Sequence, residues 1–166
     1  MDERKLRDFL LGRISASRLA RSIGRSVSHP DEMTSVVYVR DMKDPFTVTR
    51  EMVISLCDAV LHGELPPTQL QWVGFTLLAS DSFDWNEDDL LSAVFEDWSS
   101  PEINWPLTTK NVSRFKRWLA GEEAHPQTTG FSKPGQSEEK LISVTRKVSC
   151  KYPKTRAFFS RVIGGS

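Results

Sequence analysis

Apolar residues recur at every third or fourth position along most of the chain, which is the spacing of amphipathic α-helices. Residues that commonly cap helices precede these runs, and glycine or proline follows most of them. The pattern therefore predicts a mainly α protein. We expect helices that begin near Asp2, Ser15, Thr49, Pro66, Asn86 and Thr108.

Two of these helices carry more specific expectations. The second should place Leu19, Ile23 and Val27 on one face and should break at residues 28–31, which read Ser-His-Pro-Asp. The fifth should be capped by Asn86, because Asp89 follows three residues later in an arrangement similar to a capping box.

One segment, Val36–Val39, has the β-branched and aromatic composition of a strand. It could form either a short strand or an extended connector, and no partner strand is evident. We therefore allow one short β segment near residues 35–40.

Two helix junctions share a spacing. The motifs are Gly12-x-Ile14-x4-Leu19 and Gly63-x-Leu65-x4-Leu70. Each is typical of a helix that ends at a glycine and is followed by a tight turn into the next helix. The helical hairpins could pack as a bundle, or as a short HEAT/ARM-like solenoid if the two motifs belong to a true repeat.

Composition changes near the C-terminal end. Residues 121–139 are rich in Gly, Pro, Ser and Thr, as linkers are, and a basic segment follows them. Apolar spacing around Leu141 and again around Phe158 fits two further helices. The sequence thus predicts a helical domain over 1–120, a linker over 121–139 and a basic helical tail over 140–166.

The composition excludes several classes of protein. The chain has 166 residues, of which 39% are hydrophobic, so it can form a folded core of ordinary size. No apolar run is long enough to cross a membrane, and no secretory signal is recognisable. Two distant cysteines, Cys57 and Cys150, cannot form a disulfide framework. We expect a cytoplasmic protein with reduced cysteines that does not associate with membranes.

Charge is strongly segregated although the formal net charge is zero. Residues 1–50 carry a balance of +3, residues 51–109 carry 11 acidic side chains and no Lys or Arg, and residues 110–166 carry a balance of +8. The acidic middle should attract a basic protein surface, unless the basic tail folds back and neutralises it.

Catalytic signatures are missing. The chain contains no HExxH, GxSxG, Walker or GxGxxG motif. Cys57 and His62 could form a nucleophilic pair only through a tertiary contact, and the acidic cluster after Asp81 lacks the glycine that a calcium loop requires. We expect no enzyme activity, no cofactor and no metal site.

The acidic middle also contains tryptophans. Trp85 and Trp105 fall in predicted turns, where aromatic anchors beside carboxylates suit the binding of a basic protein. The expected partner-binding residues are Asp81, Asp84, Trp85, Glu87, Asp88, Asp89, Glu96, Asp97, Glu102 and Trp105.

Several of these segments resemble bacterial helical immunity proteins, the inhibitors paired with contact-dependent and other polymorphic toxins. The similar segments are Leu61-x-Gly-Glu-Leu-Pro-Pro-x-x-Leu70, Gly74-Phe75-x-Leu77-Leu78-Ala79-Ser80-Asp81-x-Phe83-x-Trp85 and Trp98-x-x-Pro101-Glu102-Ile103-Asn104. The opening Leu10-Leu11-Gly12-Arg13-Ile14-Ser15-Ala16 is similar in style to colicin-type immunity proteins. The resemblance covers residues 50–120 best.

The resemblance implies a non-enzymatic inhibitor that binds a cognate toxin, in many cases a nuclease with a basic surface. Two alternatives stay open. One is an enzyme whose carboxylates hold a metal. The other is a nucleic-acid-associated regulator that uses the tail residues Lys140, Arg146, Lys147, Lys151, Lys154, Arg156 and Arg161.

Overall fold

A computed structural model describes residues 1–31, 34–126 and 155–161 of the chain, with side chains within 1–28 and 35–126. This part of the chain is mainly helical, with short strands, as the sequence predicts. The elements in chain order are α1 (Glu3–Leu10), α2 (Ala16–Ser26), β1 (Val27–Asp31), β2 (Thr34–Arg40), β3 (Phe46–Thr47), α3 (Arg50–Leu61), α4 (Gln69–Ala79), β4 (Phe83–Asp84), α5 (Asp89–Ser99), α6 (Thr109–Leu119) and β5 (Thr155–Arg161).

The predicted helix starts are close to the observed ones, with one correction. Asp2 and Thr108 cap α1 and α6 through their side chains. The cap of α5, however, is Asp88 and not Asn86, because the Asp88 carboxylate accepts hydrogen bonds from the amides of Leu90 and Leu91. Asn86 instead has a positive φ of 51°, which places it in the preceding turn.

The two glycine junctions form the same turn. Gly12 and Gly63 have φ values of +69° and +74°, and in each case the next amide closes a Schellman-type hydrogen bond back to the helix. Helix α3 packs mainly on α6 and α4 mainly on α5, while α1 also contacts α3 and α2 also contacts α4. The described helices share one hydrophobic core.

The predicted β segment is the central strand of a three-stranded antiparallel sheet, with β1 on one side and β5 on the other. Val27, expected at the end of the second helix, begins β1 and pairs with Val37. Valine is β-branched and favours extended backbone, and pairing with β2 supplies backbone partners for this segment.

The basic tail was expected to be helical, and this is wrong for the part that the structure describes. Residues 155–161 form β5, which pairs with β2 from Arg40↔Thr155 to Thr34↔Arg161. The spacing of Ala157, Phe158 and Val162 fits a helix, but the otherwise open edge of β2 provides a backbone partner for each of the seven residues of β5. The remaining tail, most of the predicted linker and Cys150 lie outside the described residues.

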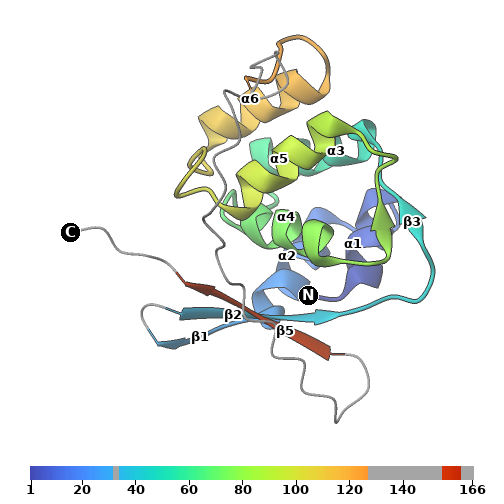
Figure 1. Cartoon of the computed structure of the whole chain (residues 1–166), viewed down its shortest axis with the longest axis vertical. Coiled ribbons are helices and arrows are strands. Elements are labelled where there is room, and N and C mark those ends of the chain that lie inside the picture. The colour runs from blue at the N-terminus through green and yellow to red at the C-terminus, as the bar shows by residue number, and fades with distance from the viewer. Residues whose placement is uncertain (32–33, 127–154, 162–166) are drawn as a thin grey trace, which may run out of the picture.

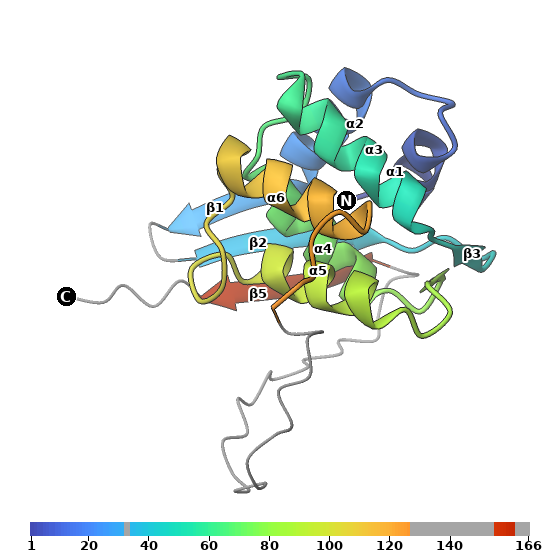
Figure 2. The ribbon, with the colours of Figure 1, turned by 90° about the horizontal axis from the view of Figure 1, so that it is seen from above.

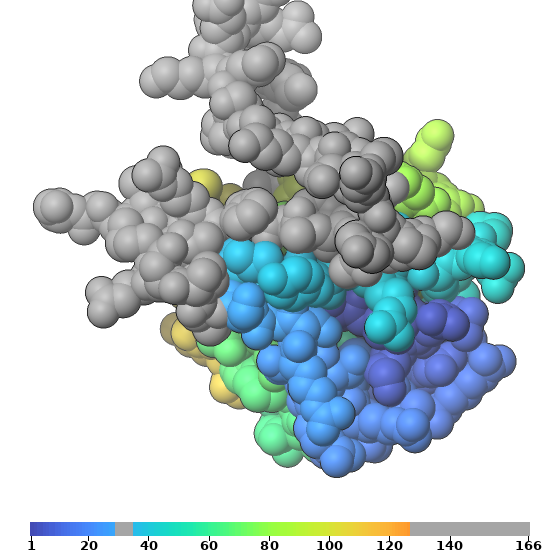
Figure 3. Space-filling model, turned by 90° about the horizontal axis from the view of Figure 1, so that it is seen from below, coloured from blue at the N-terminus to red at the C-terminus, as the bar shows by residue number. Residues whose placement is uncertain are grey.

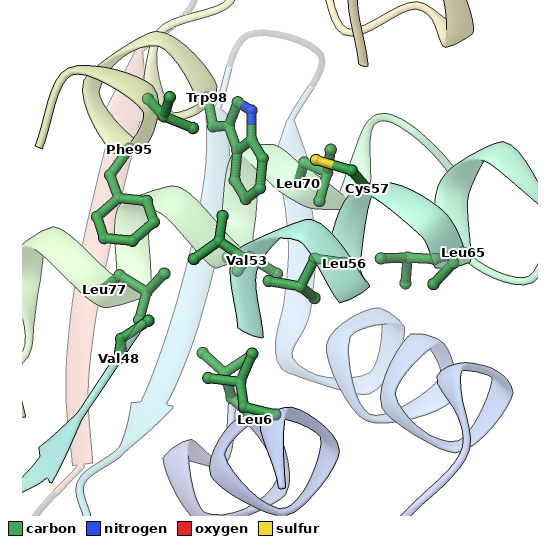
Figure 4. Close-up of a cluster of buried hydrophobic side chains, with 14 of the residues drawn as sticks. Leu6, Val48, Val53, Leu56, Cys57, Leu65, Leu70, Leu77, Phe95 and Trp98 are labelled. Carbon is green, nitrogen blue, oxygen red and sulfur yellow. The ribbon is translucent and has the colours of Figure 1, made fainter. Parts of the chain in front are cut away.

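The sheet lies at one end of the helical assembly, and α6 lies at the other (Figure 1). Figure 2 shows the same elements from above, with α3 crossing the helical layer. Between the elements lies one hydrophobic core, in which Leu6, Val53, Leu56, Phe95 and Trp98 converge from the three helices α1, α3 and α5 (Figure 4). No helix in the described ranges is long and apolar enough to cross a bilayer.

Helices α4 and α5 are in close contact at Gly74. A Cβ built on Gly74 would lie 2.8 Å from both the Phe95 carbonyl oxygen and the Trp98 Cβ. Both neighbours belong to the body of α5, so neither can move without moving that helix. Only glycine allows the two helices to approach this closely.

We predict that Gly74→Ala lowers the free energy of unfolding by about 2 kcal/mol, because the added methyl group overpacks the α4–α5 contact. Gly24→Ala in α2 is the matched control, since no atom lies within 4 Å of its Cβ position. It should raise the free energy of unfolding by about 1 kcal/mol through helix propensity. Urea denaturation of both variants measures the difference, and equal effects would contradict the close contact.

Candidate functional site

Helix α5 has two chemically different faces. Leu90, Leu91, Val94, Phe95 and Trp98 are buried in the core. Asp89 and Glu96, seven residues apart, are exposed on a common opposite face. At about 1.5 Å per residue, these two acidic residues are separated by roughly 10 Å along the outside of α5.

A strained turn brings further carboxylates to the start of α5. Asn86 and Glu87 have consecutive positive φ values of 51° and 57°, and the Asp88 amide donates to the Trp85 carbonyl oxygen at 3.0 Å. These features define a type I′ turn, in which glycine is the favoured residue at the second central position. The chain places an exposed glutamate there, and the Asp84 carboxylate steadies the turn by accepting from the Asn86 amide.

The loop after α5 extends this surface. The Asn104 side chain and the amides of Ile103 and Asn104 donate to carbonyl oxygens in the last turns of α5 and at Ser100. Glu102 is exposed, and Ile103 has 77% of its surface exposed, the largest fraction among the exposed large hydrophobic residues. Ile103 was not among the expected partner-binding residues. The signal that the sequence offered was its position after an acidic residue in a proline-containing turn.

The two tryptophans expected at the site are half-buried and fixed. Trp85 donates from Nε1 to Ser92 Oγ at 2.9 Å, and its ring lies edge-on to Phe95 with centroids 5.2 Å apart. Trp105 packs on Trp118 and carries the Arg114 guanidinium 5.2 Å from its ring centroid. Each therefore offers a rigid aromatic edge at the surface rather than a mobile side chain.

We call the resulting region the acidic surface. It consists of the exposed carboxylates Asp84, Glu87, Asp89, Glu96 and Glu102, together with Ile103 and the half-buried Trp85 and Trp105. Asp81, also expected at the site, is exposed just after α4. Most of the residues expected at the site therefore lie on or next to α5.

Asp88 lies at the edge of the acidic surface and is partly neutralised. Arg50 at the start of α3 donates to both of its carboxylate oxygens, at 2.7 and 3.0 Å. This bond, together with the amides of Leu90 and Leu91, lowers the pKa of Asp88 although burial opposes the shift. Asp58 is likewise paired, with Lys116 at 2.6 Å. The charges of Asp88 and Asp58 are thus compensated by Arg50 and Lys116, which lie in neighbouring helices. The described part of the basic tail, β5, pairs with the backbone of β2.

Asp97 does not belong to the acidic surface. Its side chain is fully buried, and Oδ2 lies 2.9 Å from Nε2 of His125, whose side chain is also fully buried. Burial raises the pKa of Asp97, while the bond to His125 opposes that shift. The second oxygen, Oδ1, has no hydrogen-bond partner among the described residues.

The Asp97–His125 pair also corrects the predicted linker. His125 packs edge-on against Trp118 with ring centroids 4.4 Å apart, so residues 121–125 are fastened to α5 and α6. The domain therefore extends past residue 120. The only sequence signal was an isolated histidine beside a proline, which does not identify a partner.

We predict that His125→Ala lowers the free energy of unfolding by about 3 kcal/mol, because it leaves the Asp97 carboxyl group buried without its partner. His62→Ala, at an exposed histidine after α3, should change stability by less than about 0.5 kcal/mol. Thermal and urea unfolding of the two variants measure the effect. Similar, small losses for both would show that the pair does not hold the segment in place.

In the described part of the chain, no arrangement of side chains matches the nucleophilic pair or the metal site that the catalytic alternatives need. Cys57 is buried, and burial raises the pKa of its thiol to about 12, whereas His62 is exposed. The described residues contain no group of three His, Cys, Asp or Glu side chains that could hold a metal ion.

The nucleic-acid alternative depends on basic residues of the tail. Those between Lys140 and Lys154 lie outside the described ranges, and Arg156 and Arg161 are placed only by the backbone of β5.

Comparison of the chain with protein-family models, with curated proteins and with solved structures finds no match in any of the three. Its own geometry defines the class: a mainly helical domain with a small antiparallel sheet and an acidic, partly aromatic surface along one helix.

Proposed function

We propose that this protein binds the basic surface of another protein through its acidic surface, and that it acts as an immunity protein against a bacterial toxin. The main observation in support of this proposal is that helix α5 has two different faces. One face is fixed in the core, and the outer face presents carboxylates. The similarity to helical immunity proteins supports the biological role. A nuclease is the favoured type of toxin, because its groove for phosphates is basic.

The composition of the acidic surface supports protein binding in particular. Aromatic and aliphatic anchors supply much of the binding energy at interfaces, while surrounding charges steer association. Ile103 and Trp105 supply such anchors beside Glu102 and Glu96. Because Trp85 and Trp105 are already held by Ser92 and Trp118, little side-chain freedom is lost when a partner covers them.

The strained turn supports the same proposal. A non-glycine residue at positive φ costs about 1 kcal/mol, and such strain is often found where side chains are needed for function. Glu87 occupies this conformation while its side chain is exposed and makes no ion pair among the described residues. On this proposal, the glutamate is kept because its charge contacts the partner.

The first test is co-expression with the product of the reading frame immediately upstream of this gene, scored by growth and by co-purification. Growth arrest by that product alone, relieved by this protein in a stable complex, is the expected result. A neighbouring product that is harmless or does not bind would remove the support for immunity.

We predict that the triple variant Glu87→Lys, Glu96→Lys, Glu102→Lys binds the toxin at least about tenfold more weakly, mainly through slower association, and more so at low salt. A control variant changes charge by the same amount at three exposed acids outside the acidic surface, Asp44, Glu64 and Glu122. It should retain at least half of the affinity. Equal losses in surface plasmon resonance would show that only net charge matters.

We predict opposite effects of Glu87→Gly on stability and on binding. Glycine removes the backbone strain, so the free energy of unfolding should rise by about 1 kcal/mol, while toxin affinity falls with the lost charge. Asn86→Gly is the control, since asparagine tolerates this conformation better and its gain should be smaller. A Glu87→Gly variant that binds as tightly as the parent would remove Glu87 from the interface.

A further inference from the structure

A basic groove lies between α1, α2 and β2. Its cavity volume is about 670 Å³. The cationic side chains that line it are Lys5, Arg18, Arg21, Arg25 and Arg40. Figure 3 shows the face on which the surfaces of α1, α2 and the segment around β2 adjoin.

Three of the cations form a stripe along α2. Arg18, Arg21 and Arg25 are exposed and lie at the i, i+3, i+7 spacing of one helix face, whereas Leu19 and Ile23 on the other face are buried. The stripe extends over about 10 Å of the helix. Ser22 and Ser26 lie on the same side and also line the groove.

The positive charge of the groove is little compensated. Asp2 is the one acidic residue among the described residues that line it, and it lies 3.8 Å from Arg40 and 3.7 Å from Arg4. Neighbouring Glu3 is buried and accepts a hydrogen bond from the Met42 amide. The groove therefore attracts an anion that carries several charges.

An accessible aromatic ring completes the groove. Tyr38 in β2 lines it and has 50% of its surface exposed, whereas its neighbours Val37 and Val39 are buried. An exposed ring beside cations can stack on a nucleic-acid base while the cations hold the adjoining phosphates.

We propose that this groove binds a short single-stranded segment of nucleic acid, with phosphates along the α2 stripe and a base on Tyr38. Pockets for small metabolites are mostly apolar, whereas cationic side chains make up half of this lining. A duplex presents no unstacked base to the ring, so a single strand uses both parts of the groove. The residues that line the groove include none of those that form the acidic surface.

Fluorescence anisotropy with labelled oligothymidylate of about eight nucleotides tests this proposal on the full chain, because single-strand sites commonly span several nucleotides. With about four phosphate contacts, the plot of log affinity against log salt should have a slope near −3. Arg18→Glu with Arg25→Glu should weaken binding at least about tenfold and flatten the slope. Arg18→Gln with Arg25→Gln, which reverses no charge, should give a smaller loss and guards against misfolding.

Two controls make the test specific. Lys43→Glu with Lys110→Glu changes net charge as much as the arginine reversal, at exposed lysines outside the groove, and should weaken binding less than threefold. Tyr38→Ala should weaken binding about tenfold, while Tyr38→Phe should retain it, since stacking needs only the ring. Binding unchanged by the arginine variants would overturn the site. Equal competition by polyglutamate, or tighter binding of the corresponding duplex, would overturn a single strand as its occupant.

Discussion

The close packing of α5 against α4 at Gly74 is the constraint on which the acidic surface depends. A single row of aromatic rings runs from Trp85 through Phe95, Trp98 and Phe115 to Trp118, and its members come from α5, α6 and the turn before α5. Because these aromatic contacts hold the buried side of α5, the helix stays in place although its outer face carries carboxylates. The charged side of the helix does not need ion pairs to stay in place.

The fold separates positive and negative charge to different surfaces. The acidic surface lies along α5, and the basic groove lies between α1, α2 and β2. The net charge of zero conceals this separation. Acidic and basic residues are concentrated in different segments of the sequence, and these segments form different elements of the fold. Each surface produces its own local field, and each would steer a partner of opposite charge.

Helical periodicity gave the positions of the six described helices because each buries a stripe of apolar residues, and Gly12 and Gly63 end helices as expected. The partners of β2 could not be predicted, since strand pairing joins residues distant in the sequence. The apolar spacing in residues 155–161 does not distinguish a helix from a strand, and the open edge of β2 makes this segment a strand. The same limit applies to Asp97 and His125, whose contact across 28 residues removes one acid from the surface and ties down the predicted linker.

The acidic surface was predictable in outline because its carboxylates lie close together in the sequence, within residues 84–102, whereas Ile103 and the Arg50–Asp88 pair required the tertiary structure. The most direct measurement is hydrogen–deuterium exchange of this protein, free and in complex with the co-purified toxin. The account predicts added protection in residues 84–89 and 96–105 and little change in α2. Protection confined to α1, α2 or β2, with the α5 region unchanged, would contradict it.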